Sequence, residues 1–264
     1  MYSLNLSHLN LPTLRFIPTQ SKIHTRRLVI IDRHGEERSR AALCEIIGSL
    51  TLPCLRELLF RSSSPHDTPL FWPRNSFPAF AARPAFGRTL TKLFLYHMVI
   101  TEDELVECLS EMSLLQELFI QDNTKASGLE CENPILLTNS LFRRLAWRPD
   151  SSLAPDLKKF AFASLLFFDE HALIQFVDSR LVPGATPDGP FKIEEISLID
   201  SELEPGIVGN ALGVLAIARM TTLQKEGQLC WSRHPSKFLE QKFPDVVGGL
   251  SPPLYPYAAI DSGF

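Results

Sequence analysis

A short apolar pattern recurs along this chain and constrains the fold more than any other feature. It places apolar side chains at its first, fourth and sixth positions, and a helix-like stretch follows each copy. The copies begin at Thr25, Leu55, Leu90, Leu115, Leu157 and Ile193, and the copy at Thr25 is the weakest. A unit of this size cannot bury its apolar side alone, but stacked units bury one continuous core. The chain is therefore expected to be an array of stacked repeats.

The alternation of strand-like and helix-like stretches predicts the fold class. Thr101 and Glu104 form a capping box, and Leu105, Leu109 and Met112 follow on one helical face. Helices are expected over residues 43–50, 75–83, 101–112, 135–146, 169–181 and 211–224. Strands that alternate with helices form a parallel sheet. We therefore predict an α/β leucine-rich-repeat solenoid, with a curved parallel sheet on the concave side and helices on the convex side.

The repeats define the expected domain boundaries. Residues 1–231 are assigned to the leucine-rich-repeat domain, with an irregular insertion over 61–88. A half-repeat over residues 6–11 suggests that the array begins before residue 25, and residues 228–231 suggest a last strand. Residues 232–264 are rich in proline, which predicts a disordered tail.

The third position of each copy carries a charge, and the sign alternates from copy to copy. This row reads Arg27, Glu57, Lys92, Glu117, Lys159 and Glu195. Side chains alternate between the two faces of a strand, so positions three, five and seven are expected on the face opposite the core. Neighbouring strands lie about 4.8 Å apart, which would put each charge beside an opposite one. The six segments are therefore expected to be consecutive rungs of one sheet.

Positions five and seven predict a protein-binding patch on the concave face. Phe94, Tyr96, Phe119 and Leu59 would lie together on adjacent rungs. Exposed aromatic side chains suit a protein anchor, because such residues carry much of the binding energy at interfaces. In the alternative, the insertion 61–88 or the tail folds over them.

Composition excludes several classes of function. Apolar residues make up 45% of the chain, its net charge is -4, and it shows no basic stripe of the kind that binds nucleic acid. No apolar run approaches the roughly 20 residues of a membrane helix, so no membrane partner is expected. Five cysteines without a C-x-x-C pair fit a reducing cytoplasmic or nuclear environment. The histidines lack metal-ligand spacing, and we expect neither a metal nor a cofactor.

The order of strand and acid-capped helix resembles a known family. Residues 90–95 followed by 100–105, residues 168–180 followed by 193–196, and residues 223–229 are similar to the repeats of F-box/leucine-rich-repeat proteins of the fungal type. The resemblance implies a non-enzymatic substrate receptor of a ubiquitin ligase, which would meet the Skp adaptor and a cullin through its F-box. No helical block precedes the first repeat, so the F-box module is expected to be absent from this chain. A repeat scaffold with no ligase link is the other interpretation of the same pattern.

One segment favours an enzyme instead. Arg33, His34 and Gly35 follow a strand and resemble the Arg-His-Gly signature of histidine phosphatases, in which the histidine takes the phosphoryl group. The second arginine, however, lies one residue later than in the acid phosphatases of that family. His66 and Asp67 also come too early in the chain to be the family's C-terminal catalytic pair. The non-enzymatic interpretation is therefore preferred, and no catalytic residue is assigned.

The tail contains a short peptide motif. Pro252, Pro253 and Tyr255 match the Pro-Pro-x-Tyr ligand of WW domains. Adjacent prolines favour the extended helix that the aromatic grooves of these domains accept. A WW-domain protein is therefore a candidate partner for the tail.

Overall fold

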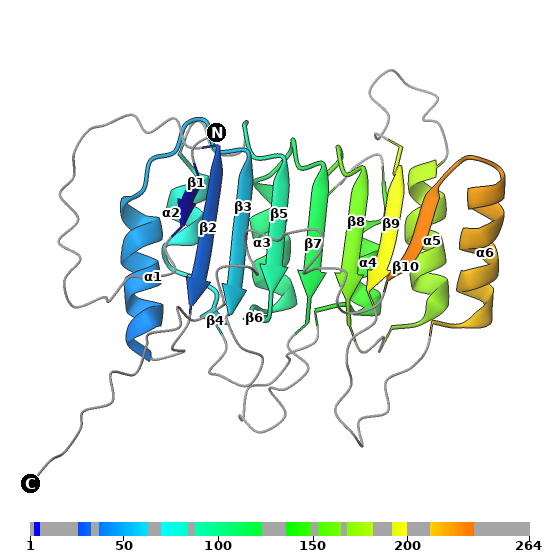
Figure 1. Cartoon of the computed structure of the whole chain (residues 1–264), viewed down its shortest axis with the longest axis horizontal. Coiled ribbons are helices and arrows are strands. Elements are labelled where there is room, and N and C mark those ends of the chain that lie inside the picture. The colour runs from blue at the N-terminus through cyan, green and yellow to red at the C-terminus, as the bar shows by residue number, and fades with distance from the viewer. Residues whose placement is uncertain are drawn as a thin grey trace, which may run out of the picture.

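The computed structural model of the chain is an α/β structure built on a parallel sheet (Figure 1). It describes residues 3–5, 26–32, 37–62, 70–83, 88–122, 136–148, 153–164, 168–181, 192–199 and 212–234. Within these ranges the sheet has eight strands, in the order β1-β2-β3-β5-β7-β8-β9-β10, and every adjacent pair is parallel. The strands are β1 (Ser3–Asn5), β2 (Arg27–Asp32), β3 (Glu57–Ser62), β5 (Lys92–Tyr96), β7 (Glu117–Gln121), β8 (Lys159–Ala163), β9 (Glu195–Ile199) and β10 (Cys230–His234).

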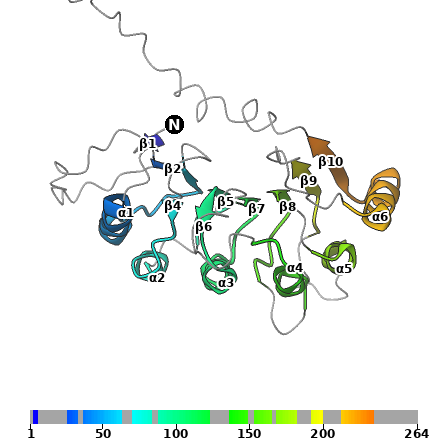
Figure 2. The ribbon, with the colours of Figure 1, turned by 90° about the horizontal axis from the view of Figure 1, so that it is seen from below.

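The helices all lie on one side of this sheet. They are α1 (Glu37–Ser49), α2 (Phe77–Ala81), α3 (Glu102–Ser110), α4 (Asn139–Leu145), α5 (Glu170–Leu181) and α6 (Val214–Lys225). Two short strands, β4 (Leu70–Phe71) and β6 (Met98–Val99), pair in parallel as a second sheet. Figure 2 shows that the main sheet curves and that the helices form its outer arc. The predicted parallel sheet and the six predicted helices are therefore confirmed.

The strands pair with each motif position beside its own copy. Leu58 of β3 is the partner of Leu28 in β2 and of Leu93 in β5. The same register continues through Leu118, Phe160, Ile196 and Trp231. Because side chains alternate along a strand, this register puts every fourth-position side chain on the helix side of the sheet. It also leaves positions three and five on the opposite face.

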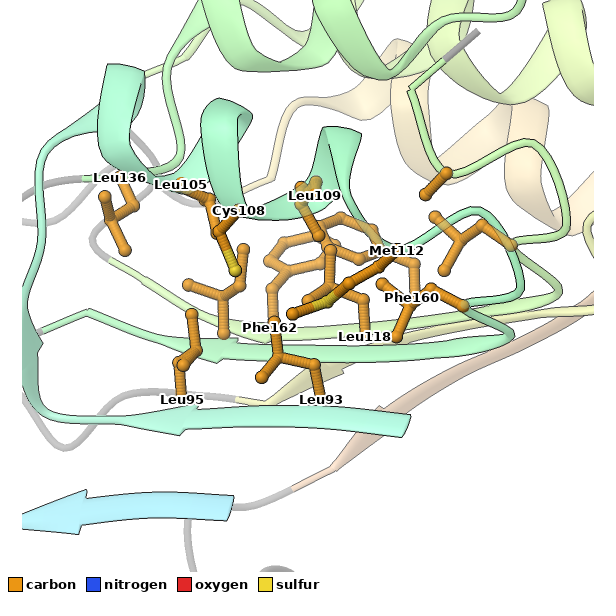
Figure 3. Close-up of a cluster of buried hydrophobic side chains, with 14 of the residues drawn as sticks. Leu93, Leu95, Leu105, Cys108, Leu109, Met112, Leu118, Leu136, Phe160 and Phe162 are labelled. Atoms are coloured by element: carbon orange, nitrogen blue, oxygen red, sulfur yellow. The ribbon is translucent and has the colours of Figure 1, made fainter. Parts of the chain in front are cut away.

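The main core fills the layer between the sheet and the helices. Figure 3 shows Leu105 and Leu109 of α3 pointing toward Leu93 and Leu118 of the strands beneath. Each of these four side chains is at most 1% exposed. Complete burial of a leucine side chain contributes about 1.5–3 kcal/mol, so this layer supplies most of the driving force for stacking.

Polar contacts near the helix starts link α3 to α4, α4 to α5 and α5 to α6. The carboxylate of Glu102 in α3 accepts from the hydroxyl of Thr138, the N-cap of α4, at 2.6 Å. Asn139 of α4 accepts from the backbone amide of Asp169 at 2.6 Å. Glu170 of α5 accepts from the backbone amide of Ala216 in α6 at 3.1 Å. These contacts satisfy polar groups at helix starts and fix the spacing between helices.

One buried cation holds the other end of the helix layer. Arg180 of α5 is 1% exposed, and its guanidinium donates to the carbonyls of Leu145 at 2.9 Å, Ala154 at 3.1 Å and Leu153 at 2.7 Å. Burial lowers the pKa of Arg180 to about 10. The carbonyls compensate the buried charge, and they attach α5 to the end of α4 and to the turn before β8.

Three details of the sequence analysis need correction. The spacing of Leu212, Leu215 and Leu223 predicts that all three lie on the inner face of α6. Leu215 is instead 54% exposed, and Ala216 and Met220 lie on that face with Leu212 and Leu223. β1 pairs through Leu4 with Leu28, ahead of the half-repeat predicted over 6–11, which lies outside the described residues. β10 continues to His234, past the boundary placed at residue 231. The expectation that the array begins before residue 25 is confirmed by β1, whereas the half-repeat over 6–11 stays a prediction.

Candidate protein-binding surface

The charged row at position three runs across the face of the sheet that points away from the helices. The register places Arg27 beside Glu57, Glu57 beside Lys92, and so on to Lys159 beside Glu195. Three of these neighbours form ion pairs, Arg27–Glu57 at 3.3 Å, Lys92–Glu117 at 2.9 Å and Lys159–Glu195 at 3.2 Å. The predicted ladder of alternating charges is therefore confirmed.

The ladder is more accessible in its central and later strands than at β2 and β3. The side chains of Arg27 and Glu57 are 19% and 17% exposed, whereas Lys92 and Lys159 are 39% and 45% exposed. The contact with Glu195 raises the pKa of Lys159 above its usual value. Half-exposed ion pairs contribute about 0.2–1 kcal/mol each, so the ladder specifies register more than it adds stability.

The aromatic patch predicted beside this ladder is buried. Leu59, Phe94, Tyr96 and Phe119 are between 0% and 6% exposed, although they lie together on adjacent rungs as expected. The rings of Tyr96 and Phe119 pack with their centroids 4.6 Å apart. Burial raises the pKa of the Tyr96 hydroxyl well above its usual value. These side chains form a second apolar cluster, so the prediction that they are an exposed anchor is wrong for this structure.

Position two carries a pair of arginines that the sequence analysis did not single out. Arg26 and Arg56 directly precede the charges that begin the ladder, and both are exposed. The backbone amide of Arg56 donates to the carbonyl of Arg26 at 2.8 Å, so the two residues are neighbours on adjacent rungs. The arginine pair was visible in the same register that gave the ladder, because position two reads Arg26, Arg56, Thr91, Gln116, Lys158 and Glu194.

A buried carboxylate lies at the end of β7. Asp122 is 1% exposed and accepts hydrogen bonds from the backbone amide of Leu136 at 2.9 Å and from the hydroxyl of Ser164. Burial raises the pKa of Asp122 to about 6, against the opposing effect of these hydrogen bonds. The carboxylate joins the end of one strand to the segment before α4 and to the end of β8. Among the described residues its side chain accepts only from backbone amides and one hydroxyl, so the carboxylate has a structural role.

Two predicted sites lie outside the described residues. Arg33, His34 and Gly35 of the phosphatase-like segment are among them, as are Pro252, Pro253 and Tyr255 of the WW-ligand motif. Both remain predictions. Among the residues that the structure does describe, no cluster of histidine, cysteine or acidic side chains is arranged to hold a metal ion.

Comparisons with known proteins do not assign a family to this chain, so a functional proposal rests on the geometry of the structure. Neither the protein-family models nor the curated proteins contain a match for this chain. Within the described parts of the chain, no helix has the length and apolar character needed to cross a bilayer. The features that bear on function are therefore the charge ladder, the arginine pair and the buried aromatic cluster.

Proposed function

We propose that this chain is a leucine-rich-repeat solenoid that binds a protein partner through the concave face of its sheet and has no catalytic role. The order of the strands, their common register and the single helix layer support the repeat assignment. The observation that carries the binding proposal is the continuous row of partly exposed charges across six adjacent strands. Such a row offers complementary charge and a defined register to a partner.

The burial of the aromatic cluster changes which part of the face is proposed to bind. Phe94 and Phe119 cannot anchor a partner while they are 6% and 3% exposed. Lys92 and Lys159 remain accessible on the same face, and their ion pairs are partly exposed. Charged residues of this kind contribute mainly to partner selection and to the association rate.

In this proposal the binding serves ubiquitination, which is what the resemblance to F-box/leucine-rich-repeat proteins implies. In this proposal the chain selects a substrate for a ligase built on the Skp adaptor and a cullin, in the cytoplasm or nucleus. A repeat scaffold with no ligase link uses the same face, and differs in having no adaptor.

Affinity purification of the tagged chain from cells separates the two roles. The ligase role requires an F-box that this sequence does not itself show. In that role the Skp adaptor and a cullin should co-elute with the tagged protein expressed from its own locus, both for the wild type and for the variant Lys92→Glu/Lys159→Glu. The variant should lose the substrate, because two cations of the ladder are reversed. If an F-box protein captures the adaptor in the same experiment and this chain does not, the ligase role is excluded.

A further inference from the structure

The arginine pair is a cationic site on a chain of net negative charge. Arg26 and Arg56 directly precede β2 and β3, two strands that begin at the upper edge of the sheet in Figure 1. Arg88, which precedes β5, is exposed as well. In the part of the chain that the structure describes, none of these three side chains forms an ion pair, and the whole chain has a net charge of -4.

Farther along the sheet, the charges at position two of the repeat compensate one another. Lys158 and Glu194 occupy position two in β8 and β9, and their side chains form an ion pair at 3.7 Å. At position three, every neighbour has the opposite sign. Like charges on adjacent strands are unfavourable. Arg26 beside Arg56 is therefore an exception to the pairing of opposite charges in these two rows.

The carboxylate of Glu57, beside Arg56, and the carbonyl of Gly48, in the helix that precedes β3, already have other partners. The carboxylate of Glu57 contacts Arg27 at 3.3 Å. The carbonyl of Gly48, in the last turn of α1, accepts from the guanidinium of Arg83. Neither Glu57 nor this carbonyl therefore compensates the positive charge of the exposed arginine pair.

We infer that the arginine pair, at the edge of the sheet where β2 and β3 begin, anchors an acidic peptide segment, with clustered aspartate or glutamate, in a protein partner. The inference rests on the proposed protein-binding function and specifies its partner. A guanidinium group binds a carboxylate through two parallel hydrogen bonds, and two arginines on adjacent strands, whose backbones lie about 4.8 Å apart, can engage neighbouring acidic side chains.

The surrounding charges favour a short peptide over a nucleic acid. Glu57, Glu117 and Glu195 recur along position three and would repel a phosphate backbone laid across the sheet. A short acidic segment contacts only the first rungs, where the positive charges are in excess. The charge pattern thus selects a peptide.

Binding of a fluorescein-labelled hexaglutamate peptide to the purified full chain, followed by fluorescence anisotropy at low ionic strength, tests the inference. We expect Arg26→Ser/Arg56→Ser to weaken binding about tenfold, because both guanidinium groups are lost. Lys158→Ser is the matched control, since it removes a cation from the same row that is already paired with Glu194. Its binding should stay within about twofold of wild type. Melting temperatures of the variants show that the fold is retained, because both arginines are exposed.

Three results would overturn the inference. They are equal affinity of the double variant and the wild type, equal binding of hexaglutamine, and tighter binding of single-stranded DNA than of hexaglutamate. Failure of the wider proposal is distinguishable from these. A chain that binds hexaglutamate as expected but captures no adaptor retains the acidic-peptide site and loses the ligase role.

Discussion

At the scale of single residues, the first turn of α6 depends on a side chain from another helix. Gly213, the N-cap of α6, has no side chain to accept from the free backbone amides. The carboxylate of Glu170 accepts from the amide of Ala216, the third residue of the helix, as a capping serine or aspartate would. A β-carbon at Gly213 would overlap this carboxylate. A side chain at position 213 would therefore push the Glu170 carboxylate away from the helix start, although the backbone angles of Gly213 suit any residue.

Gly213→Ala should therefore destabilise the protein although alanine is the better helix former. We expect a loss of about 1–2 kcal/mol in the free energy of unfolding, because the Glu170 carboxylate is displaced from the helix start. Urea denaturation measures this loss. In a Glu170→Ala background the same substitution should cost less, and the remaining cost reflects the preference for glycine over alanine at an N-cap. An equal cost in both backgrounds would show that Glu170 is not the group displaced.

Asp122 should make the stability of the protein depend on pH. Its pKa is about 6 in the folded protein and near 3.8 when unperturbed, so the folded state binds the proton more tightly. Its contribution to stability is complete below about pH 4 and is lost as the pH rises through 6. The difference of roughly two units corresponds to about 3 kcal/mol.

Urea denaturation at a series of pH values tests this assignment. The wild-type chain should lose stability relative to Asp122→Asn between about pH 4 and pH 7, because the asparagine cannot ionise. Asp103→Asn is the control, since it removes a carboxylate that is 85% exposed. Parallel curves for the wild type and Asp122→Asn would contradict the assignment.

At the scale of elements, the charge ladder should contribute to the choice of strand neighbours. Lys92→Glu would put three carboxylates on three adjacent strands, between Glu57 and Glu117. We expect a loss of about 1 kcal/mol, which falls at high salt as the charges are screened. Lys92→Gln removes the ion pair without adding repulsion and should cost about half as much. Urea denaturation at low and high salt measures the stability of both variants. Equal losses that do not change with salt would exclude a contribution of the charge ladder to stability.

The sequence predicts the elements well and their surroundings less well. Position three alone gave the correct partners of Lys92, because a period of two and an alternating sign are local properties of each strand. The capping box at Thr101 and Glu104 located the start of α3 for the same reason. Burial of Phe94 and exposure of Leu215 depend on which other side chains pack against them. A pattern along one element carries no information about such packing.

At the scale of the whole molecule, each inner strand of the main sheet lies between the strands of the preceding and the following repeat. This stacking determines which side chains lie on each face of the sheet. The helix side holds the main core, and the other face holds the ladder above a smaller buried cluster. A shift of one residue between any two strands would exchange the two faces and place charges in the core. The partner binding that we propose for the concave face requires the register to be continuous.

Cross-strand NOEs between backbone protons, measured by NMR on the isotope-labelled chain, test this register most directly. Leu59 should connect to Phe94, and Phe94 to Phe119, with the series continuing to Ala161 and Ser197. Connections displaced by one residue, or running in the antiparallel sense between any two of these strands, would contradict the stacked arrangement.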